Sequence, residues 1–145
     1  MNPTPSLVIG ALCLLAGAAP FAHAGALRAD HPLVGTWRLD VKALSCHETY
    51  SIRADGTTLV TSAKEVARSE IVVSDQPSAA GFYQWVDTVV QDNGQPDCAG
   101  GVTAVGHQAT NYIRLRPDGQ MFVMCEQESL DACIGPFVRM AGTES

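Results

Sequence analysis

The chain has 145 residues, of which 46% are hydrophobic and 17% are charged, and its formal net charge is −6 at pH 7. This length suits one small domain and leaves no room for a second. An acidic surface repels phosphate backbones, which argues against nucleic acid as a partner. Small apolar molecules or cationic proteins suit this chain better.

Residues 7–19 form an apolar run that is too short for a transmembrane helix and has the length of a secretory signal core. Ala22-His23-Ala24 places small residues at the −3 and −1 positions of a cleavage site. We therefore expect residues 1–24 to be a signal peptide and residues 25–145 to form a single periplasmic or secreted domain. The alternative is that the run forms a buried N-terminal helix of the fold.

The remaining chain is rich in strand patterns and has no convincing helix. Residues 47–54 alternate between two faces, as a half-buried strand does. Residues 65–74 fit a helix or a strand by period, and their β-branched residues favour a strand. Asp55-Gly56 and Asp118-Gly119 predict tight turns, because these residues tolerate positive φ. The predicted strands are residues 35–41, 47–54, 57–62, 65–74, 82–91, 111–116, 120–126 and 134–140.

Eight antiparallel strands joined mostly by short connections are what an up-and-down barrel needs. The sequence thus predicts an all-β fold, an eight-stranded antiparallel up-and-down barrel without a C-terminal helix. Residues 92–108 are expected to form a long irregular loop. The alternation of strand direction places both Asp-Gly turns at one end of the barrel and the four cysteines of residues 25–145 at the other.

These four cysteines, an even number in a small exported domain, predict two disulfides. Cys125 and Cys133 face each other if residues 127–131 form a hairpin turn. We therefore favour this pair, which leaves Cys46 with Cys98. The other two pairings remain open.

The first and last strands contain a pair of residues that indicates closure. Gly35-Thr36-Trp37 opens the first strand, and Arg139 lies near the end of the last. If the sheet closes, Arg139 can lie over the Trp37 ring as a cation–π partner. This pattern resembles the lipocalin-like (calycin) family of small barrels. In that family the glycine and tryptophan begin the first strand, and an arginine packs across the indole. The resemblance implies structural roles for Gly35, Trp37 and Arg139.

The resemblance also implies a barrel interior that holds a small apolar ligand. The alternative is an interior filled with side chains that binds nothing. Strands 82–90 and 121–125 are apolar on both sides, so the pattern leaves their inward face open. The expected interior, and hence ligand-binding, residues are Tyr50, Ile52, Leu59, Phe82, Val86, Ile113, Leu115, Phe122 and Met124.

Catalytic and metal signatures are weak. We expect His47 and His107 to lie near Asp97 and Glu126, and these four residues suggest a metal site. No His-x-x-x-His spacing occurs, however. No Gly-x-Ser-x-Gly nucleophile motif is found, and a solvated acidic surface accounts for the carboxylates. We expect no metal, no cofactor and no enzymatic activity, and we expect His31 to lie on the surface.

A second function belongs to a different class. Trp85 shares a side of its strand with Tyr83 and Asp87, which suggests an outward aromatic patch. The acidic loops at residues 92–108 and 126–132 suggest a protein-interaction module. Such a module would be an inhibitor or immunity factor for a cationic envelope enzyme.

Overall fold

The computed structural model describes residues 25–142, and the predicted signal peptide lies outside them. The described residues form eight strands and one 3-10 turn. In chain order the elements are β1 (Gly35–Val41), η1 (Lys42–Leu44), β2 (Cys46–Ile52), β3 (Thr57–Ser62), β4 (Glu65–Val73), β5 (Tyr83–Asp92), β6 (Gln108–Leu115), β7 (Met121–Cys125) and β8 (Cys133–Arg139).

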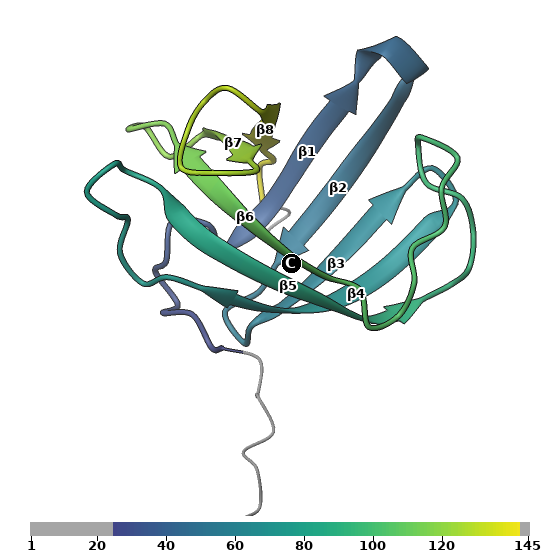
Figure 1. Ribbon diagram of the computed structural model, residues 1–145, viewed down its shortest axis with the longest axis horizontal. Coiled ribbons are helices and arrows are strands. Elements are labelled where there is room, and N and C mark those ends of the chain that lie inside the picture. The colour runs from purple at the N-terminus through teal and green to yellow at the C-terminus, as the bar shows by residue number, and fades with distance from the viewer. Residues whose placement is uncertain (1–24, 143–145) are drawn as a thin grey trace, which may run out of the picture.

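The strands close into a barrel (Figure 1). Each strand pairs antiparallel with the next along the chain, and β1 pairs with β8 through Trp37 opposite Arg139 and Leu39 opposite Phe137. Closure leaves the sheet without edges and encloses a single interior. The predicted all-β, eight-stranded antiparallel barrel is confirmed.

The largest boundary difference is at β6, which begins three residues before the predicted strand. Gln108, Ala109 and Thr110 pair with β5, although none of them is a large apolar residue. Their pairing extends β6 into the segment that the sequence predicts as loop. Tertiary pairing outweighs local pattern at this point.

The core contains a cluster of aromatic residues around Trp37, at what we call the packed end. Trp37 is fully buried, and its ring makes an edge contact with Phe122, with centroids 4.7 Å apart. Phe122 stacks on Phe137 at 4.5 Å. The Arg139 guanidinium lies 4.1 Å from the Trp37 ring centroid, which confirms the predicted cation–π contact.

Gly35 makes the position of this arginine possible. Its φ of 136° is one that residues with a side chain rarely adopt, and a Cβ there would lie 2.6 Å from Arg139 Nη1. The guanidinium uses this space to donate hydrogen bonds to the carbonyls of Pro32, Val34 and Gly119. The glycine, the indole and the arginine therefore form one unit that joins β1, β8 and the lead-in segment.

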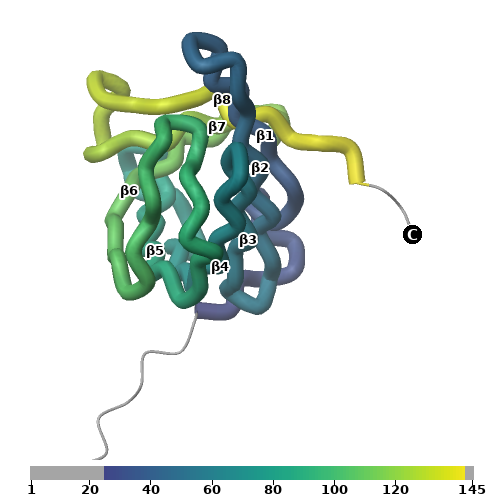
Figure 2. Tube along the Cα trace, turned by 90° about the vertical axis from the view of Figure 1, so that its right-hand side faces the viewer, coloured from purple at the N-terminus to yellow at the C-terminus, as the bar shows by residue number. Residues whose placement is uncertain are grey.

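The lead-in, residues 25–34, lies at the lower end of the barrel in Figure 2. It contributes buried Leu27 and Leu33 to the core. His31 is 3% exposed. Its Nδ1 accepts the Leu33 N–H at 3.2 Å, and its Nε2 lies 3.2 Å from the Ser74 carbonyl oxygen. The expectation of a surface position for His31 is wrong. The lead-in is too short to show a periodic pattern, and tertiary contacts bury this residue.

Candidate functional site: an open cavity inside the barrel

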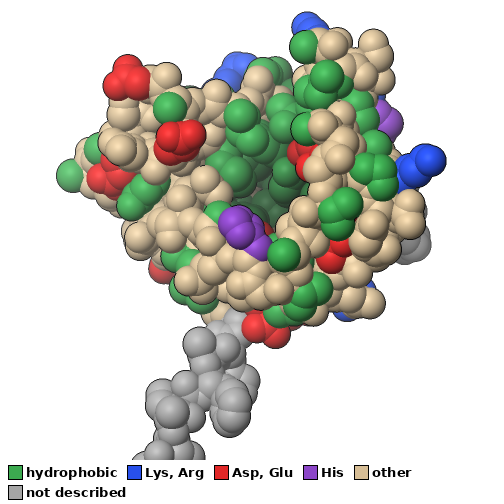
Figure 3. All heavy atoms as spheres, turned by 45° about the vertical axis from the view of Figure 1, so that its right-hand side comes forward, with side chains coloured by type: hydrophobic (Ala, Val, Ile, Leu, Met, Phe, Trp, Pro, Cys, Tyr) green, Lys and Arg blue, Asp and Glu red, His purple; other side chains and the backbone are tan. Residues whose placement is uncertain are grey.

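The barrel is hollow at the end that carries the disulfides, which we call the open end. A cavity of about 140 Å³ lies between the strands, and a wider hollow of about 400 Å³ lies beside Cys125 and Cys133. Asn111 and Met124 line both spaces, so the cavity and the hollow adjoin at these two residues. Figure 3 shows the molecule hollowed on one face, with hydrophobic side chains in the wall. The inner cavity is lined by Tyr50, Thr58, Val60, Trp85, Asp87, Asn111 and Met124.

Cross-strand pairing explains why these side chains meet. Residues opposite each other in an antiparallel pair point to the same face of the sheet. Trp37 lies in the core and pairs with Tyr50, which in turn pairs with Val60. Trp85 pairs with Asn111 in the same way. The cavity wall thus combines residues from β2, β3, β5, β6 and β7.

Six of the nine residues predicted to line a ligand site do point toward the barrel interior. Tyr50 and Met124 line the inner cavity. The others pack in or against the core of the packed end, where they form part of the support for the cavity rather than its lining. These residues are Ile52, Ile113, Leu115 and Phe122.

Leu59 and Val86 face outward, and the prediction of an interior position is wrong for both. On β3 the interior positions are Thr58 and Val60, the neighbours of Leu59 in the chain. Val86 pairs with Val72, which is 52% exposed. Because side chains alternate along a strand, a shift of one residue exchanges the inner and outer faces.

Phe82 is also wrongly predicted to be interior, although it is buried. It lies just before β5, and the guanidinium of Arg114 covers its ring at 5.3 Å. Arg114 is exposed and donates a hydrogen bond to the Ala80 carbonyl in the loop before Phe82. The loop and the arginine bury Phe82 against the outer face of the barrel, so burial here does not indicate an interior position.

The sequence reasoning did not assign Thr58, Val60, Trp85, Asp87 or Asn111 to the site. Trp85 is 3% exposed, so its interpretation as part of an outward patch is wrong. The signal that would have found these residues is the register. Once Trp37 is placed inside, its pairing with Tyr50 places Tyr50 inside. The hairpin across Asp55-Gly56 then places Val60 and Thr58 inside as well.

Two polar groups of the inner cavity are poorly compensated. Burial raises the pKa of the Asp87 carboxyl, while Ser69 and His107 act in the opposite direction. Thr58 is 1% exposed, and its hydroxyl has no hydrogen-bond partner within residues 25–142. Buried polar groups of this kind cost folding free energy. Perturbed groups in a cavity are a common feature of functional sites.

We expect Asp87→Asn to raise the melting temperature near neutral pH. The folded-state pKa of Asp87 is raised, so the folded protein binds the proton more tightly than the unfolded chain does. The stability due to this carboxyl is complete at low pH and is lost as pH rises through the raised pKa. The advantage of the variant should therefore shrink as the pH falls toward the ordinary aspartate range. Thermal melts of both proteins from pH 7 to pH 4 measure this difference, and a variant less stable than the parent at pH 7 would contradict it.

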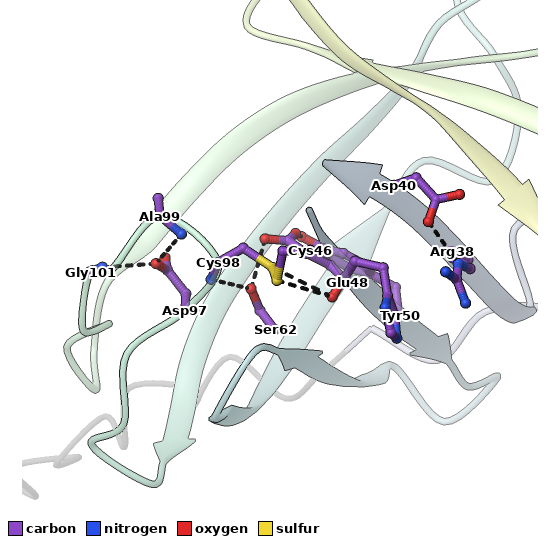
Figure 4. The surroundings of a disulfide bond; sticks show 11 residues. Arg38, Asp40, Cys46, Glu48, Tyr50, Ser62, Asp97, Cys98, Ala99 and Gly101 are labelled. Atoms are coloured by element: carbon purple, nitrogen blue, oxygen red, sulfur yellow. Dashed lines mark hydrogen bonds and ion pairs between the residues drawn. A yellow bond between two sulfur atoms is a disulfide. The ribbon is translucent and has the colours of Figure 1, made fainter. Parts of the chain in front are cut away.

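A hydrogen-bonded chain connects the cavity wall with the Cys46–Cys98 disulfide (Figure 4). The Tyr50 hydroxyl donates to Glu48 Oε2 at 2.8 Å, and the Ser62 hydroxyl donates to Glu48 Oε1 at 2.8 Å. The Cys98 N–H donates to Ser62 Oγ at 2.9 Å. Burial, together with the Glu48 charge, raises the pKa of Tyr50 well above its ordinary value, so its hydroxyl stays protonated and donating. Both oxygens of Glu48 are thereby engaged in holding the wall.

The structure forms the two favoured disulfides, Cys46–Cys98 and Cys125–Cys133. Both lie at the open end, as predicted. They are consistent with a protein of an oxidising compartment, outside the cell or in the periplasm. Within the described part of the chain, no helix has the length and apolar character needed to cross a membrane.

One carboxylate considered as a metal ligand, Asp97, has a structural role. Asp97 Oδ1 accepts the N–H groups of Ala99 and Gly101 at 2.9 and 2.8 Å, and so fixes its own loop. Across residues 25–142, no three histidine, cysteine, aspartate or glutamate side chains gather in a way that could hold a metal ion.

Comparison of the chain with protein-family models, with curated proteins and with solved structures finds no match. The resemblance to the lipocalin-like family therefore rests on the residues and the barrel alone, and membership in that family stays a prediction. What the protein does has to be argued from the cavity.

Proposed function

We propose that this protein is a small exported, lipocalin-like barrel that binds a small apolar molecule in its open end. The observation that supports the proposal most strongly is the inner cavity, which adjoins a wider hollow of about 400 Å³. That volume is in the range of about 300–1,000 Å³ that is usual for small-molecule sites.

The lining supports an apolar ligand with a few directed polar contacts. Val60, Trp85 and Met124 offer apolar and polarisable surface in the inner cavity, and Ile134, 53% exposed, extends it into the hollow. The methionine adapts to ligands of different shape, because its side chain is unbranched and flexible. Tyr50 and Thr58 add hydroxyl groups at defined positions.

A matched pair of valine substitutions tests this proposal, with 1-octanol as the probe. Val60→Phe places a larger side chain in the inner cavity, whereas Val86→Phe makes the same change on the outer face of the barrel. Excluding two methylene groups of the probe removes about 1.6 kcal/mol of burial free energy, which is roughly tenfold in Kd. We expect Val60→Phe to weaken octanol binding by at least about tenfold in isothermal titration calorimetry, and Val86→Phe to leave it unchanged. Equal binding by both variants would place the probe elsewhere and contradict the proposal.

Protein interaction is a second candidate, favoured by the loops around the open end. Val102, Val105 and Leu130 are each more than 60% exposed, and they lie in loops that also carry carboxylates. An inhibitor of a cationic enzyme would present such acidic and apolar loops. Its binding would weaken steeply as salt is added, because attraction between exposed charges is screened. It would also be insensitive to Val60→Phe.

A further inference from the structure

The inner cavity has acidic and aromatic groups but no cationic side chain. Its only ionisable carboxyl is Asp87, and its two aromatic rings belong to Tyr50 and Trp85. Among the residues that line the inner cavity and the wider hollow, none is a lysine or an arginine, and Glu126 adds a second carboxyl at the hollow. The electrostatic character of this interior is therefore negative.

This arrangement disfavours two classes of ligand head group. A carboxylate or phosphate would be brought toward Asp87 with no lysine or arginine among the lining residues, and like charges at close range repel strongly. A neutral hydrocarbon would leave the Thr58 hydroxyl without a partner, and would displace water from the Asp87 carboxylate beside it. A ligand that suits the cavity has to donate hydrogen bonds and carry positive charge.

We propose that the inner cavity recognises the protonated primary-amine head of an amphipathic ligand, with Asp87 as its ionic partner. The ammonium group donates to the Asp87 carboxylate and to the Thr58 hydroxyl. The faces of Trp85 and Tyr50 attract a cation held between them. The apolar tail leads past Met124 toward Ile134 in the wider hollow.

Thr58 favours a primary amine over a quaternary one. Its hydroxyl is buried without a hydrogen-bond partner within the described chain, and it lines the same cavity as Asp87. A primary ammonium has three N–H donors and can satisfy the carboxylate, the hydroxyl and the Asn111 amide oxygen together. A quaternary ammonium has no N–H donor and would leave the hydroxyl unpaired.

This inference rests on the proposed binding of apolar molecules, and the two can fail separately. The probes are octylamine, octanol and octanoate, which share one chain length and differ in the head group. Calorimetry at neutral pH, where the amine is protonated, gives the Kd of each. We expect octylamine to bind at least about tenfold more tightly than octanol, because hydrogen bonds to charged groups are the stronger kind. Octanoate should bind most weakly.

Two variants separate the specific contact from the general charge of the protein. Asp87→Asn should remove the preference for octylamine over octanol. Asp40→Asn, which removes one negative charge from an exposed ion pair with Arg38, should keep the preference. Equal affinities for octylamine and octanol would overturn the amine inference and leave apolar binding standing. An equal loss of the octylamine preference in Asp87→Asn and Asp40→Asn would do the same. Absence of binding by all three probes would overturn both proposals.

Discussion

Replacing Trp37 by alanine should lower the free energy of unfolding by about 3–5 kcal/mol, the usual penalty for truncating a large buried aromatic residue. The indole is fully buried and donates its N–H to the Leu33 carbonyl at 2.9 Å. It also contacts Phe122 and supports the Arg139 guanidinium on its face. Its loss leaves a cavity and removes the cation–π contact that joins the ends of the sheet. Urea unfolding followed by circular dichroism measures the change.

A conservative variant distinguishes ring packing from the indole hydrogen bond. Trp37→Phe keeps an aromatic face for Arg139 and Phe122 but removes the N–H donor to Leu33, so its penalty should lie well below that of the alanine variant. A near-neutral result for Trp37→Ala would contradict the role of this residue as the centre of the packed end.

Removing the Cys46–Cys98 disulfide should destabilise the protein more than removing Cys125–Cys133. The first bridge spans a sequence separation of 52 residues and the second a separation of 8. In the chain-entropy description, closing the longer loop is worth about 4 kcal/mol and closing the shorter loop about 2.5 kcal/mol. Paired alanine substitutions at each bridge, compared by urea unfolding, give the order.

The two bridges also differ in what they touch. Cys98 is connected through Ser62 and Glu48 to Tyr50 in the cavity wall, so loss of its bridge should also weaken ligand binding. An equal loss of stability for both double variants, or the reverse order, would contradict the loop-length argument.

The packed end of the barrel was predictable from the sequence because its signals are specific. Gly35, Trp37 and Arg139 are recognisable by residue type and by their places in the first and last strands. The turns at Asp55-Gly56 and Asp118-Gly119 then fix the direction of the neighbouring strands. Direction alone also places the four cysteines together at the other end.

The cavity was harder to predict because its strands are apolar on both faces. Phe82, just before β5, and Val86 on β5 lie on the outer face, where the preceding loop and the neighbouring strands partly cover them. Trp85 and Asp87 point inward. Hydrophobicity therefore does not mark the inner face there. The polar members of the cavity, Thr58 and Asn111, resemble solvent-facing strand residues until the register is known.

The position of a bound ligand tests the account most directly, and the methionines offer a way to observe it. Met124 lines the inner cavity, Met121 lines a separate groove on the outer surface with Leu130, and Met140 is 41% exposed. NMR spectra of protein labelled with ¹³C in the methionine methyl groups, recorded during an octanol titration, report on these places separately. A saturable shift of the Met124 signal with the other two unmoved is the predicted result. A Met124 signal that stays in place at saturating octanol, with or without movement of Met121, would contradict a ligand site inside the barrel.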